Sequence, residues 1–455
     1  MSLPASRLPG ALLTRLRLLA QGLLALPRLA LIVIAAWRNG AGPARDRITA
    51  ALATSPALRA GFDFARAFWP NPALSRRFIT AYANTGTVIV TRYDDVKDVL
   101  RRDGEFTVVY GPRMQAVTGG HNFFLGMQDS PDYTRDVSNM RLVVRRDDLP
   151  GRVAPFLAHT ASVLAAAAGA RIDVPAALTR RVPARLVAEY FGTPGPDEDL
   201  LIEWATLLFW YLFNDLQADP QLDARALAAA EGLRSWLDQT IVARKQAPRA
   251  SDDVLARCLA LQASGTPGMG DLEIRNNLLG LIVGAIPTQS RAAVQVLNQL
   301  LLQPQALAAA QQAARSDDDE GLARHVLEAL RFDPINPMIY RYASCDAVIA
   351  PNTWRARKVR AGTMVFAANL SAMFDPLRIA DPGSFRVDRP SSDYILWGDG
   401  LHTCFGAHLN RVALPAMLKP LLRRPGLRRA AGPAGQIDCQ GTPFPVHFWV
   451  ESDAT

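Results

Sequence analysis

The segment from Trp397 to Gly406 constrains this chain more than any other, because it places one cysteine in a glycine-rich loop directly before an expected helix. It reads Trp-Gly-Asp-Gly-Leu-His-Thr-Cys-Phe-Gly, and residues 407–422 have helical spacing. At the start of a helix, backbone N–H groups and the helix dipole favour a charged sulfur, so Cys404 suits an exposed thiolate. Glycine permits backbone conformations and close approach to a flat ring that a Cβ would obstruct. The loop glycines are Gly398, Gly400 and Gly406.

Two interpretations of Cys404 follow, an axial ligand of haem iron or a buried free cysteine in a loop. Three glycines, a histidine and a cysteine at fixed offsets rarely coincide, because each type is a minor part of ordinary composition. The pattern therefore favours the ligand.

This loop resembles the haem-binding loop of the cytochrome P450 family, Phe-Gly-x-Gly-x-His/Arg-x-Cys-x-Gly, with Trp397 in place of the phenylalanine. Glu328 and Arg331 match the family's helical Glu-x-x-Arg, where three-residue spacing puts both side chains on one face. Arg389, in Phe-Arg-Val-Asp-Arg, matches the third member of that structural ion cluster. The resemblance covers residues 60 to 450, and it implies a mainly α fold with small β-sheets and haem b bound through Cys404.

The resemblance also implies residues that bind the haem propionates. His402 and Arg341 occupy positions that usually do so. Residues 129–135 resemble a segment that opens a propionate-binding helix, but Tyr133 replaces its usual histidine and Val137 its usual arginine. Tyr133 can still donate one hydrogen bond. The spacing leaves open which nearby arginine supplies the charge, the candidates being Arg135, Arg141 and Arg145.

A long helix is expected from Asp271, which can cap it, to about Gln303. It resembles the family's central helix above the haem, where oxygen-activating members carry an acid–alcohol pair that relays protons. Here Thr288 remains, but Pro287 replaces the acid and Ala285 a glycine, and proline is expected to kink the helix. Relatives that lack the acid tend to use an oxygen donor already at the peroxide level. Gln289 would steer a hydroperoxide oxygen if it faces the iron, or would simply face another helix.

Residues 200–214 are strongly apolar and aromatic. They form either a core helix or, as in this family, the roof of the substrate pocket. The candidate substrate contacts are Phe209, Phe213, Asn214 and Ala285.

Three functions remain open. The first is a haem-thiolate oxidoreductase that oxidises a lipophilic, fatty-acid-like molecule with peroxide or a lipid hydroperoxide. The second is a monooxygenase using dioxygen and electrons from a separate ferredoxin or reductase, since the chain has no flavin, nicotinamide or iron–sulfur motif. An acidic ferredoxin would dock on a basic C-terminal surface of Arg411, Lys419, Arg423 and Arg424. The third is a non-catalytic haem-binding sensor.

Charge and cysteine content limit the partners and the compartment. The net charge is +8, but no aromatic–basic interleaving supports nucleic-acid binding. The four cysteines have no metal or disulfide spacing, which indicates a reducing cytoplasm. We expect an N-terminal segment at 1–45 and a single catalytic domain at 46–455.

Residues 8–37 of that segment are apolar and basic, with Pro27 expected to kink a helix and Arg28 disfavouring a membrane span. A helix on a membrane surface or on the protein itself is preferred to a signal peptide. Further expectations are a strand at 87–90, helices at 93–102, 153–170 and 173–192, and a long loop at 104–128.

Overall fold

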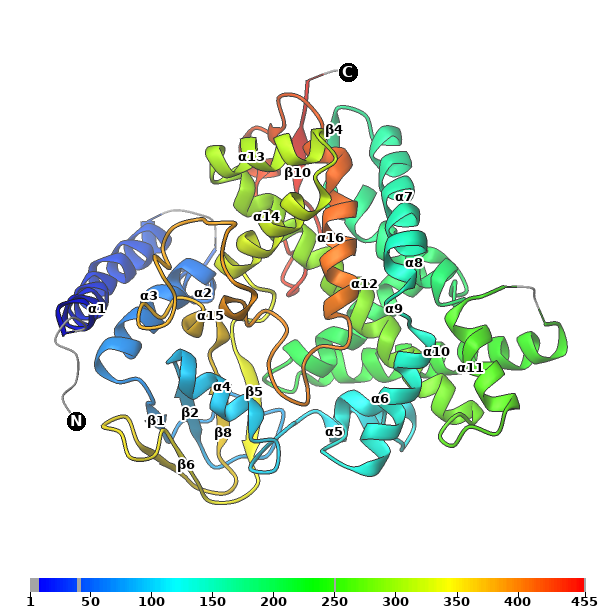
Figure 1. Cartoon of the computed structure of the whole chain (residues 1–455), viewed down its shortest axis with the longest axis horizontal. Helices are drawn as coiled ribbons and strands as arrows, with labels where there is room; N and C mark the ends of the chain where they lie inside the picture. The colour runs from blue at the N-terminus through cyan, green and yellow to red at the C-terminus, as the bar shows by residue number, and fades with distance from the viewer. Residues whose placement is uncertain (1–7, 39–41, 249–250, 454–455) are drawn as a thin grey trace. The chain divides into compact units, whose positions relative to one another are not determined.

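The computed structural model describes residues 8–38, 42–248 and 251–453, with side chains from residue 12 onward. It is mainly helical with small β-sheets, which confirms the expected fold class (Figure 1). The chain divides into two compact units. Unit 1 contains the described residues up to Thr107 and Arg331–Thr403, and unit 2 contains Val108–Leu330 and the described residues from Cys404 onward. The expected boundary between residues 45 and 46 stays a prediction.

Unit 1 is built on a five-stranded sheet in the order β1-β2-β8-β5-β3. Its strands are β1 (Ala73–Leu74), β2 (Thr87–Val90), β3 (Phe106–Thr107), β5 (Ile339–Ala343) and β8 (Met364–Ala367), and a separate pair is formed by β6 (Ala347–Ile349) and β7 (Arg357–Val359). β2 runs parallel to β8, and the expected strand at 87–90 is confirmed. Val88, Val365 and Phe106 belong to one buried core in this unit.

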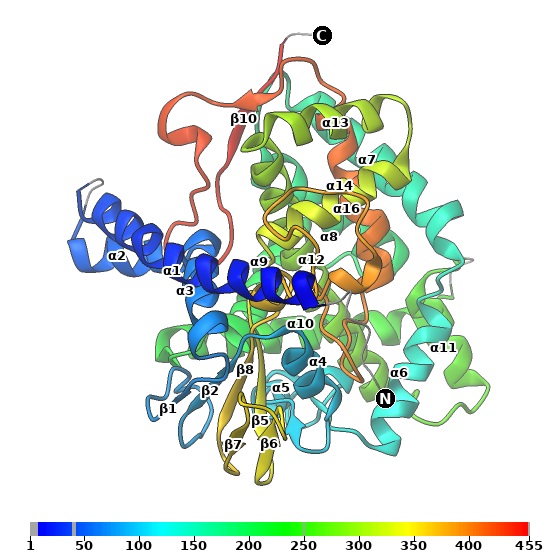
Figure 2. The same cartoon turned by 60° about the vertical axis from the view of Figure 1, so that its left-hand side comes forward.

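The helices of unit 1 are α1 (Leu8–Arg38), α2 (Ala44–Leu52), α3 (Ser55–Phe68), α4 (Tyr93–Arg101) and α15 (Asn369–Ala372), with a 3-10 turn at Ser391–Asp393. α1 packs along α3 and against α2 (Figure 2). Pro27 lies inside α1, which continues to Arg38, and the expected kink at Pro27 stays a prediction. A proline removes only one helical hydrogen bond, and the contacts with α3 hold the flanking turns.

Unit 2 is a helical body with one three-stranded sheet, β4-β10-β9. Its α-helices are α5 (Gly111–Thr118), α6 (Pro131–Val143), α7 (Ala154–Ala167), α8 (Arg181–Tyr190), α9 (Glu198–Phe209), α10 (Pro220–Gln246), α11 (Val254–Ala263), α12 (Asp271–Leu301), α13 (Pro304–Arg315) and α16 (Ala407–Leu422). The strands are β4 (Arg171–Asp173), β9 (Arg428–Arg429) and β10 (Trp449–Glu451). α14 (Asp319–Phe332) begins in unit 2 and ends in unit 1.

Short π- and 3-10 segments complete unit 2. The π-helical turns are η2 (Leu149–Val153), η3 (Pro175–Thr179) and η4 (Trp210–Asn214), and the 3-10 turns are η1 (Phe124–Gly126) and η6 (Gly432–Gly435). The expectation of an irregular loop at 104–128 is wrong, because this stretch contains β3, α5 and η1. Gly111 and Pro112 mark the start of α5, where an orphan N–H needs no helical partner.

α12 is the central helix of unit 2 and most of its side chains are buried. Its N-cap is Gly270 rather than Asp271, whose carboxylate instead accepts hydrogen bonds from Lys245 and Gln262. Pro287 lies inside the helix, which continues to Leu301. α12 packs against α16, the helix that follows Cys404 (Figure 1). Cys404 and Thr288 therefore belong to one compact body.

Candidate functional site

The loop before Cys404 is fixed by two glycines and an aspartate in unit 1. Gly398 and Gly400 have φ angles of 77° and 78°, which other residues resist. A Cβ on Gly400 would clash with the carbonyl oxygen of Leu100. Asp399, between them, pairs with Lys97 at 3.3 Å and Arg101 at 3.0 Å, so the loop is tied to α4.

Gly406 differs from the other two loop glycines in its backbone conformation. Its φ is −79°, an ordinary value for any residue. A Cβ there would lie 3.8 Å from the Cys404 sulfur and 3.6 Å from the Asn410 amide. Gly406 therefore does not need glycine's backbone freedom, which corrects one part of the expectation for the loop glycines. The other part, close approach to a flat ring, stays a prediction.

The Cys404 thiol is accessible to solvent although it lies deep among protein atoms. Those atoms raise the pKa of the thiol, and the backbone N–H of Gly406 lowers it by less. The helix start thus favours the thiolate as expected, but in the protein alone burial outweighs this effect. A coordinated metal cation deprotonates a thiol outright, and an accessible sulfur beside a backbone donor fits such a ligand.

His402 and Arg341, the two residues expected to bind a haem propionate, both lie in unit 1. Arg341, on β5, is 3% exposed and donates to the carbonyl of Tyr340 at 3.0 Å. Burial first, and the charge of Arg341 second, lower the pKa of His402 to about 4. Its Nε2 lies 3.8 Å from Asp103. The positive charge of Arg341 disfavours a second positive charge on His402. A bound anion such as a propionate would offset this repulsion, so the pair fits an anion-binding role.

Tyr133 and the nearby arginines lie in unit 2. Tyr133 is buried on α6, whose N-cap Ser130 accepts from its backbone N–H. Arg135 pairs with Asp132 and Asp136 at 2.8 and 2.9 Å, so two carboxylates already neutralise it.

The other two arginines that could supply the charge missing at Val137 are Arg145 and Arg141. Arg145 donates to the carbonyl of Leu142. Arg141 is exposed, one turn beyond Val137 on α6. The arginine that replaces Val137 therefore stays unassigned.

On α12, one stripe of side chains is only half-buried in an otherwise buried stretch. It consists of Gly284, Ala285 and Thr288, one turn apart. A Cβ on Gly284 would meet no atom of the described residues within 4 Å. The Thr288 hydroxyl donates to the Gly284 carbonyl, which leaves the hydroxyl lone pairs available to a further donor.

Gln289 is buried beside this stripe, with 2% exposure. Its Oε1 accepts no hydrogen bond within the described part of the chain. A buried acceptor without a donor costs about 1–3 kcal/mol, so a water or ligand donor would stabilise it. Both interpretations of Gln289 thus retain support, since the side chain faces protein while its oxygen lacks a partner.

Aromatic rings connect Cys404 to α12 within unit 2. Phe405 packs on Phe124 at 5.3 Å between ring centroids, and Phe124 on Phe123 at 6.4 Å. Phe123 lies against Gly280 of α12, where a Cβ would clash with its ring.

The predicted ion cluster is buried. Arg331 and Arg389 both donate to the carbonyl of Ser384, at 3.2 and 2.9 Å. The Arg331 guanidinium also lies 4.3 Å from the centroid of Phe374. Glu328, one turn earlier on α14, is completely buried. Both arginines bind the carbonyls of the segment that leads to Cys404, which fits a structural role.

The candidate substrate contacts Phe209 and Phe213 belong to an aromatic group in unit 2. Their centroids are 4.6 Å apart, and they pack on Phe444 at 6.0 Å and Tyr110 at 4.7 Å respectively. Asn214 has a buried Oδ1 that accepts no hydrogen bond among described residues. Sequence reasoning missed Phe444, because Pro-Phe-Pro at 443–445 indicates only a loop.

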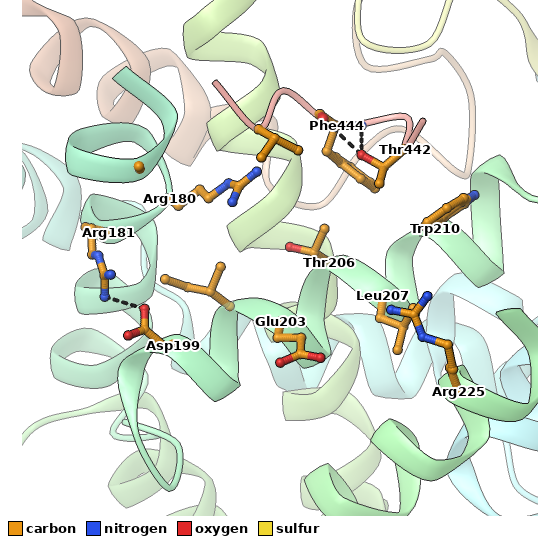
Figure 3. A pocket seen from close by; sticks show the side chains of 13 residues that line it. Arg180, Arg181, Asp199, Glu203, Thr206, Leu207, Trp210, Arg225, Thr442 and Phe444 are labelled. Carbon is orange, nitrogen blue, oxygen red and sulfur yellow. Dashed lines mark hydrogen bonds and ion pairs between the residues drawn. The ribbon is translucent and has the colours of Figure 1, made fainter. Parts of the chain in front are cut away.

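Phe444 also lines a pocket of about 350 Å³ in unit 2 (Figure 3). Arg180 lines this pocket and is half-buried. It donates a hydrogen bond to the Pro445 carbonyl at 2.6 Å. Arg225 faces the opposite part and forms no ion pair within the described residues (Figure 3). Half of the remaining lining residues are apolar, namely Ala176, Ile202, Leu207, Trp210 and Val446. The other half are polar, namely Arg181, Asp199, Glu203, Thr206 and Thr442.

The basic C-terminal surface differs from the expectation. Lys419 pairs with Asp317 and Asp319 at 2.7 and 2.6 Å, and Arg423 pairs with Asp317. Arg424 donates to the carbonyls of Ala165 and Gly169. Internal contacts therefore already use most of these cations.

Comparisons with known proteins identify the family of this chain. The family model described as Cytochrome P450 matches residues 200–426. Mycinamicin IV hydroxylase/epoxidase of Micromonospora griseorubida is 28% identical over 359 residues, 75% of this chain and 82% of that protein. A bifunctional dioxygenase–epoxy alcohol synthase of Pyricularia oryzae is 29% identical over 190 residues, 40% of this chain and 16% of that protein. The crystal structure of CalO2 superposes with a TM-score of 0.72 at 21% identity, covering 88% of this chain and 96% of that one.

Proposed function

The chain is a member of the cytochrome P450 family, whose members hold haem through a cysteine thiolate, and from that premise we propose that it is a monooxygenase. It would insert one oxygen atom of dioxygen into a lipophilic small molecule, with electrons from a separate ferredoxin or reductase. The observation that carries the proposal is the half-open stripe of Gly284, Ala285 and Thr288 on the helix that packs against α16. The hydroxylase/epoxidase relative supports the same reaction class.

Each residue of the set has a distinct proposed role. Cys404 is the axial ligand, and bound haem would supply the oxygen-activating chemistry, to which a thiolate donates electron density. His402 and Arg341 would hold a propionate by hydrogen bonding and charge, and Tyr133 would add one hydrogen bond. Trp397 and Gly398 would shape the loop before Cys404. Glu328, Arg331 and Arg389 would form the structural ion cluster.

Thr288 is the proposed proton-handling group. Its hydroxyl proton is directed at the Gly284 carbonyl, so its oxygen is free to accept a hydrogen bond from a water on the half-open stripe. Pro287 cannot pass a proton as the family's carboxylic acid does. Protons would therefore reach the site through Thr288 and water alone, and slow proton supply is the expected consequence.

Isomerisation of a lipid hydroperoxide is a second candidate function. Pro287 in place of the acid favours it, because such a substrate already contains the O–O bond and needs no delivered protons. The unpartnered Oε1 of buried Gln289 would accept a hydrogen bond from the hydroperoxide. Similarity to the epoxy alcohol synthase of Pyricularia oryzae supports this candidate over part of the chain.

The pocket supports a substrate with one acidic end. Arg180 is attracted by the charge of Asp173 but forms no ion pair with a carboxylate, and Arg225 forms none either among the described residues. Half of the other lining residues are apolar. A fatty-acid-like molecule would place its carboxylate at these arginines and its chain along Leu207 and Phe444. Phe444 contacts Phe209, so the same ligand would reach the aromatic group.

A test of this substrate class compares a long-chain fatty acid with its methyl ester. Replacing Arg180 and Arg225 by glutamine should raise KM for the acid about tenfold or more and leave KM for the ester unchanged, because a lost charge-assisted hydrogen bond weakens only the acid. Equal changes for both compounds would contradict the assignment.

The oxygen donor is decided by two parallel assays on haem-loaded protein. One supplies dioxygen with a surrogate ferredoxin system, and the other supplies a fatty-acid hydroperoxide alone. A monooxygenase turns over in the first assay, and Thr288→Val should slow it by about tenfold or more, since a positioned proton donor contributes at least that much. Turnover only in the second assay, sensitive to Gln289→Leu, would replace the first proposal by the second.

The ligand assignment has its own test. Cys404→Ala should abolish the thiolate-type Soret band of the ferrous carbon monoxide complex. Cys439→Ala, which changes another partly accessible cysteine, should leave that band intact. Persistence of the band in the first variant would disprove the role of Cys404.

A further inference from the structure

The outer side of α1 carries a continuous set of exposed apolar side chains. They are Leu12, Leu13, Leu16, Leu19, Leu23, Leu24, Leu26, Leu31, Ile34 and Trp37, each between 40% and 66% exposed. Soluble surfaces rarely carry apolar patches of this extent, and such patches mark interaction sites. Phe68 of α3, 42% exposed, flanks Gly22 of α1, so the apolar surface continues onto the next helix.

The inner side of α1 is docked on its own unit. Leu18 and Ala25 are 4% and 0% exposed. A Cβ on Gly22, between them, would lie 2.5 Å from the Ala67 Cβ and 2.8 Å from the Phe68 ring. Spacings of four and three residues place these small side chains on one stripe, which lets α1 lie along α3 (Figure 2).

Further contacts hold the C-terminal end and the middle of α1. Arg47 of α2 donates to the carbonyls of Ala36 and Trp37 in the last turn of α1, at 3.0 and 2.7 Å. These are carbonyls that the helix itself leaves without partners. Near the middle, Arg28 lies 3.9 Å from Asp63 of α3. A helix held along its length in this way lies on the protein surface.

The charges of α1 indicate whether its apolar side binds a second copy of the chain or a lipid surface. The helix has no acidic residue, and its arginines Arg15, Arg17, Arg28 and Arg38 are exposed. A second copy of the chain would bring the same positive charges, which repel. An anionic lipid surface attracts them by about 1 kcal/mol for each arginine.

From these observations we propose that α1 is an interfacial membrane helix. It stays docked on α3 and inserts its outer apolar side into the headgroup and acyl boundary of a bilayer that contains anionic lipid. A helix with an apolar outer side, a basic charge pattern and a docked inner side lies in the plane of the membrane. Among the described helices α1 is the one long and apolar enough to cross a membrane, but Arg28 and its docking stripe fit an in-plane position better.

Flotation of the full haem-loaded protein with vesicles tests this proposal. Wild type should float with phosphatidylcholine vesicles containing phosphatidylglycerol, and about tenfold less with pure phosphatidylcholine. The triple variant Leu16→Glu, Leu23→Glu and Leu31→Glu should lose at least about tenfold of the bound fraction, because three charges replace inserted leucines. A matched variant, Leu142→Glu with Leu302→Glu, changes equally exposed leucines of unit 2 and should float like wild type.

Several outcomes would overturn the proposal. These are a wild type that stays in solution, and a triple variant that still floats. A wild-type dimer that the triple variant abolishes in light scattering would assign the face to a second copy. Resistance to alkaline carbonate extraction would indicate a span, and an intact mass lacking the N-terminal residues would indicate a cleaved targeting segment. The carbon monoxide spectrum of the triple variant should match wild type, which separates this test from the proposed oxidation.

Discussion

At the residue scale, the loop before Cys404 shows that its glycines have separate functions. Gly400 combines a left-handed backbone with contact against the Leu100 carbonyl, so both its φ and its size are required. Gly406 has an ordinary φ and ordinary contact distances. The same residue type thus serves the fold at one position and access to the sulfur at the other.

This difference predicts opposite results for two alanine substitutions. Gly400→Ala should lower the free energy of unfolding by about 3 kcal/mol, through the left-handed φ and the backbone clash. Gly406→Ala should change it by less than about 1 kcal/mol, while altering the haem spectrum or its carbon monoxide complex. Chemical unfolding of both proteins measures the first quantity, and equal destabilisation would contradict this account.

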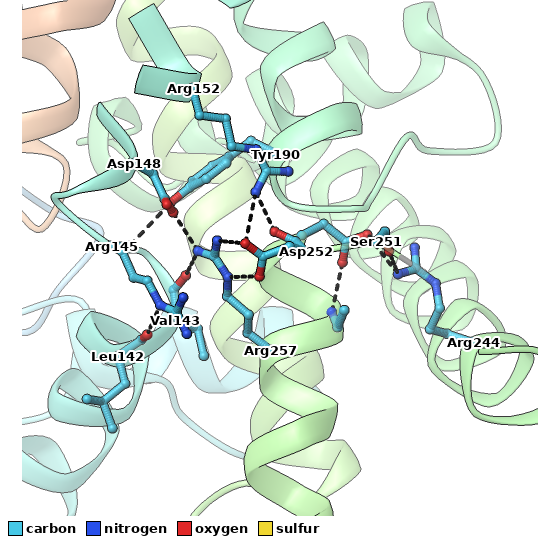
Figure 4. A network of polar contacts seen from close by, with 12 residues as sticks. Leu142, Val143, Arg145, Asp148, Arg152, Tyr190, Arg244, Ser251, Asp252 and Arg257 are labelled. Atoms are coloured by element: carbon cyan, nitrogen blue, oxygen red, sulfur yellow. Dashed lines mark hydrogen bonds and ion pairs between the residues drawn. The ribbon is translucent and has the colours of Figure 1, made fainter. Parts of the chain in front are cut away.

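At the element scale, a polar network in unit 2 attaches α11 to the end of α6 and to α8 (Figure 4). Arg257 of α11 pairs with Asp148 and Asp252, each at 2.5 Å, and the Tyr190 hydroxyl donates to Asp148 at 2.7 Å. Burial raises the pKa of Asp148, but the hydrogen bonds from Arg257 and Tyr190 lower it by more, so the net shift is downward. The ionised form of Asp148 therefore stabilises the fold.

Asp148→Asn should destabilise the protein by about 2 kcal/mol at pH 7, because Arg257 loses a buried partner. A depressed folded pKa contributes stability that is complete above the unfolded value of about 3.9 and is lost as the pH falls through the lower folded value. The difference between wild type and variant should therefore shrink below pH 4. Asp147→Asn, at the exposed neighbouring position, should match wild type throughout, and a pH-independent difference would disprove the electrostatic cause.

At the scale of the whole molecule, the chain carries a net charge of +8, and some of its arginines lie near the helix that follows Cys404. Four residues after Cys404, burial and the charges of Arg146, Arg411 and Arg141 lower the pKa of the exposed His408. These arginines lie on α6, the segment after it and α16, all in unit 2. They form an exposed basic patch beside the cysteine helix, and we infer that an acidic electron donor docks there rather than at Lys419 and Arg423.

Arg141→Glu with Arg146→Glu should raise KM for an acidic ferredoxin about tenfold at low ionic strength, with little change in kcat, because rim charges act mainly on association. The effect should diminish as salt screens the charges. Arg76→Glu with Arg77→Glu, an equal charge change at exposed sites in unit 1, should leave KM unchanged. Equal effects of both substitutions would indicate a response to net charge alone.

Much of the fold and of the site was predictable because it depends on local pattern. The strand at Thr87–Val90, the helix at Tyr93–Arg101 and the long α12 follow from residue periodicity and end signals. The kinks predicted at Pro27 and Pro287 stay predictions. Both helices continue past their prolines, because packing against neighbouring helices stabilises a helix that loses one hydrogen bond.

The sequence by itself determined the family, its haem chemistry and the identity of the cysteine ligand candidate, because residue type and spacing along one loop carry that information. Only the tertiary structure decided which charges are already paired, that Phe444 reaches Phe209, and that α1 has one docked and one apolar exposed side. These properties depend on contacts between segments far apart in the chain. Spacing along the sequence does not specify such contacts, since each residue's partner is set by how the helices pack.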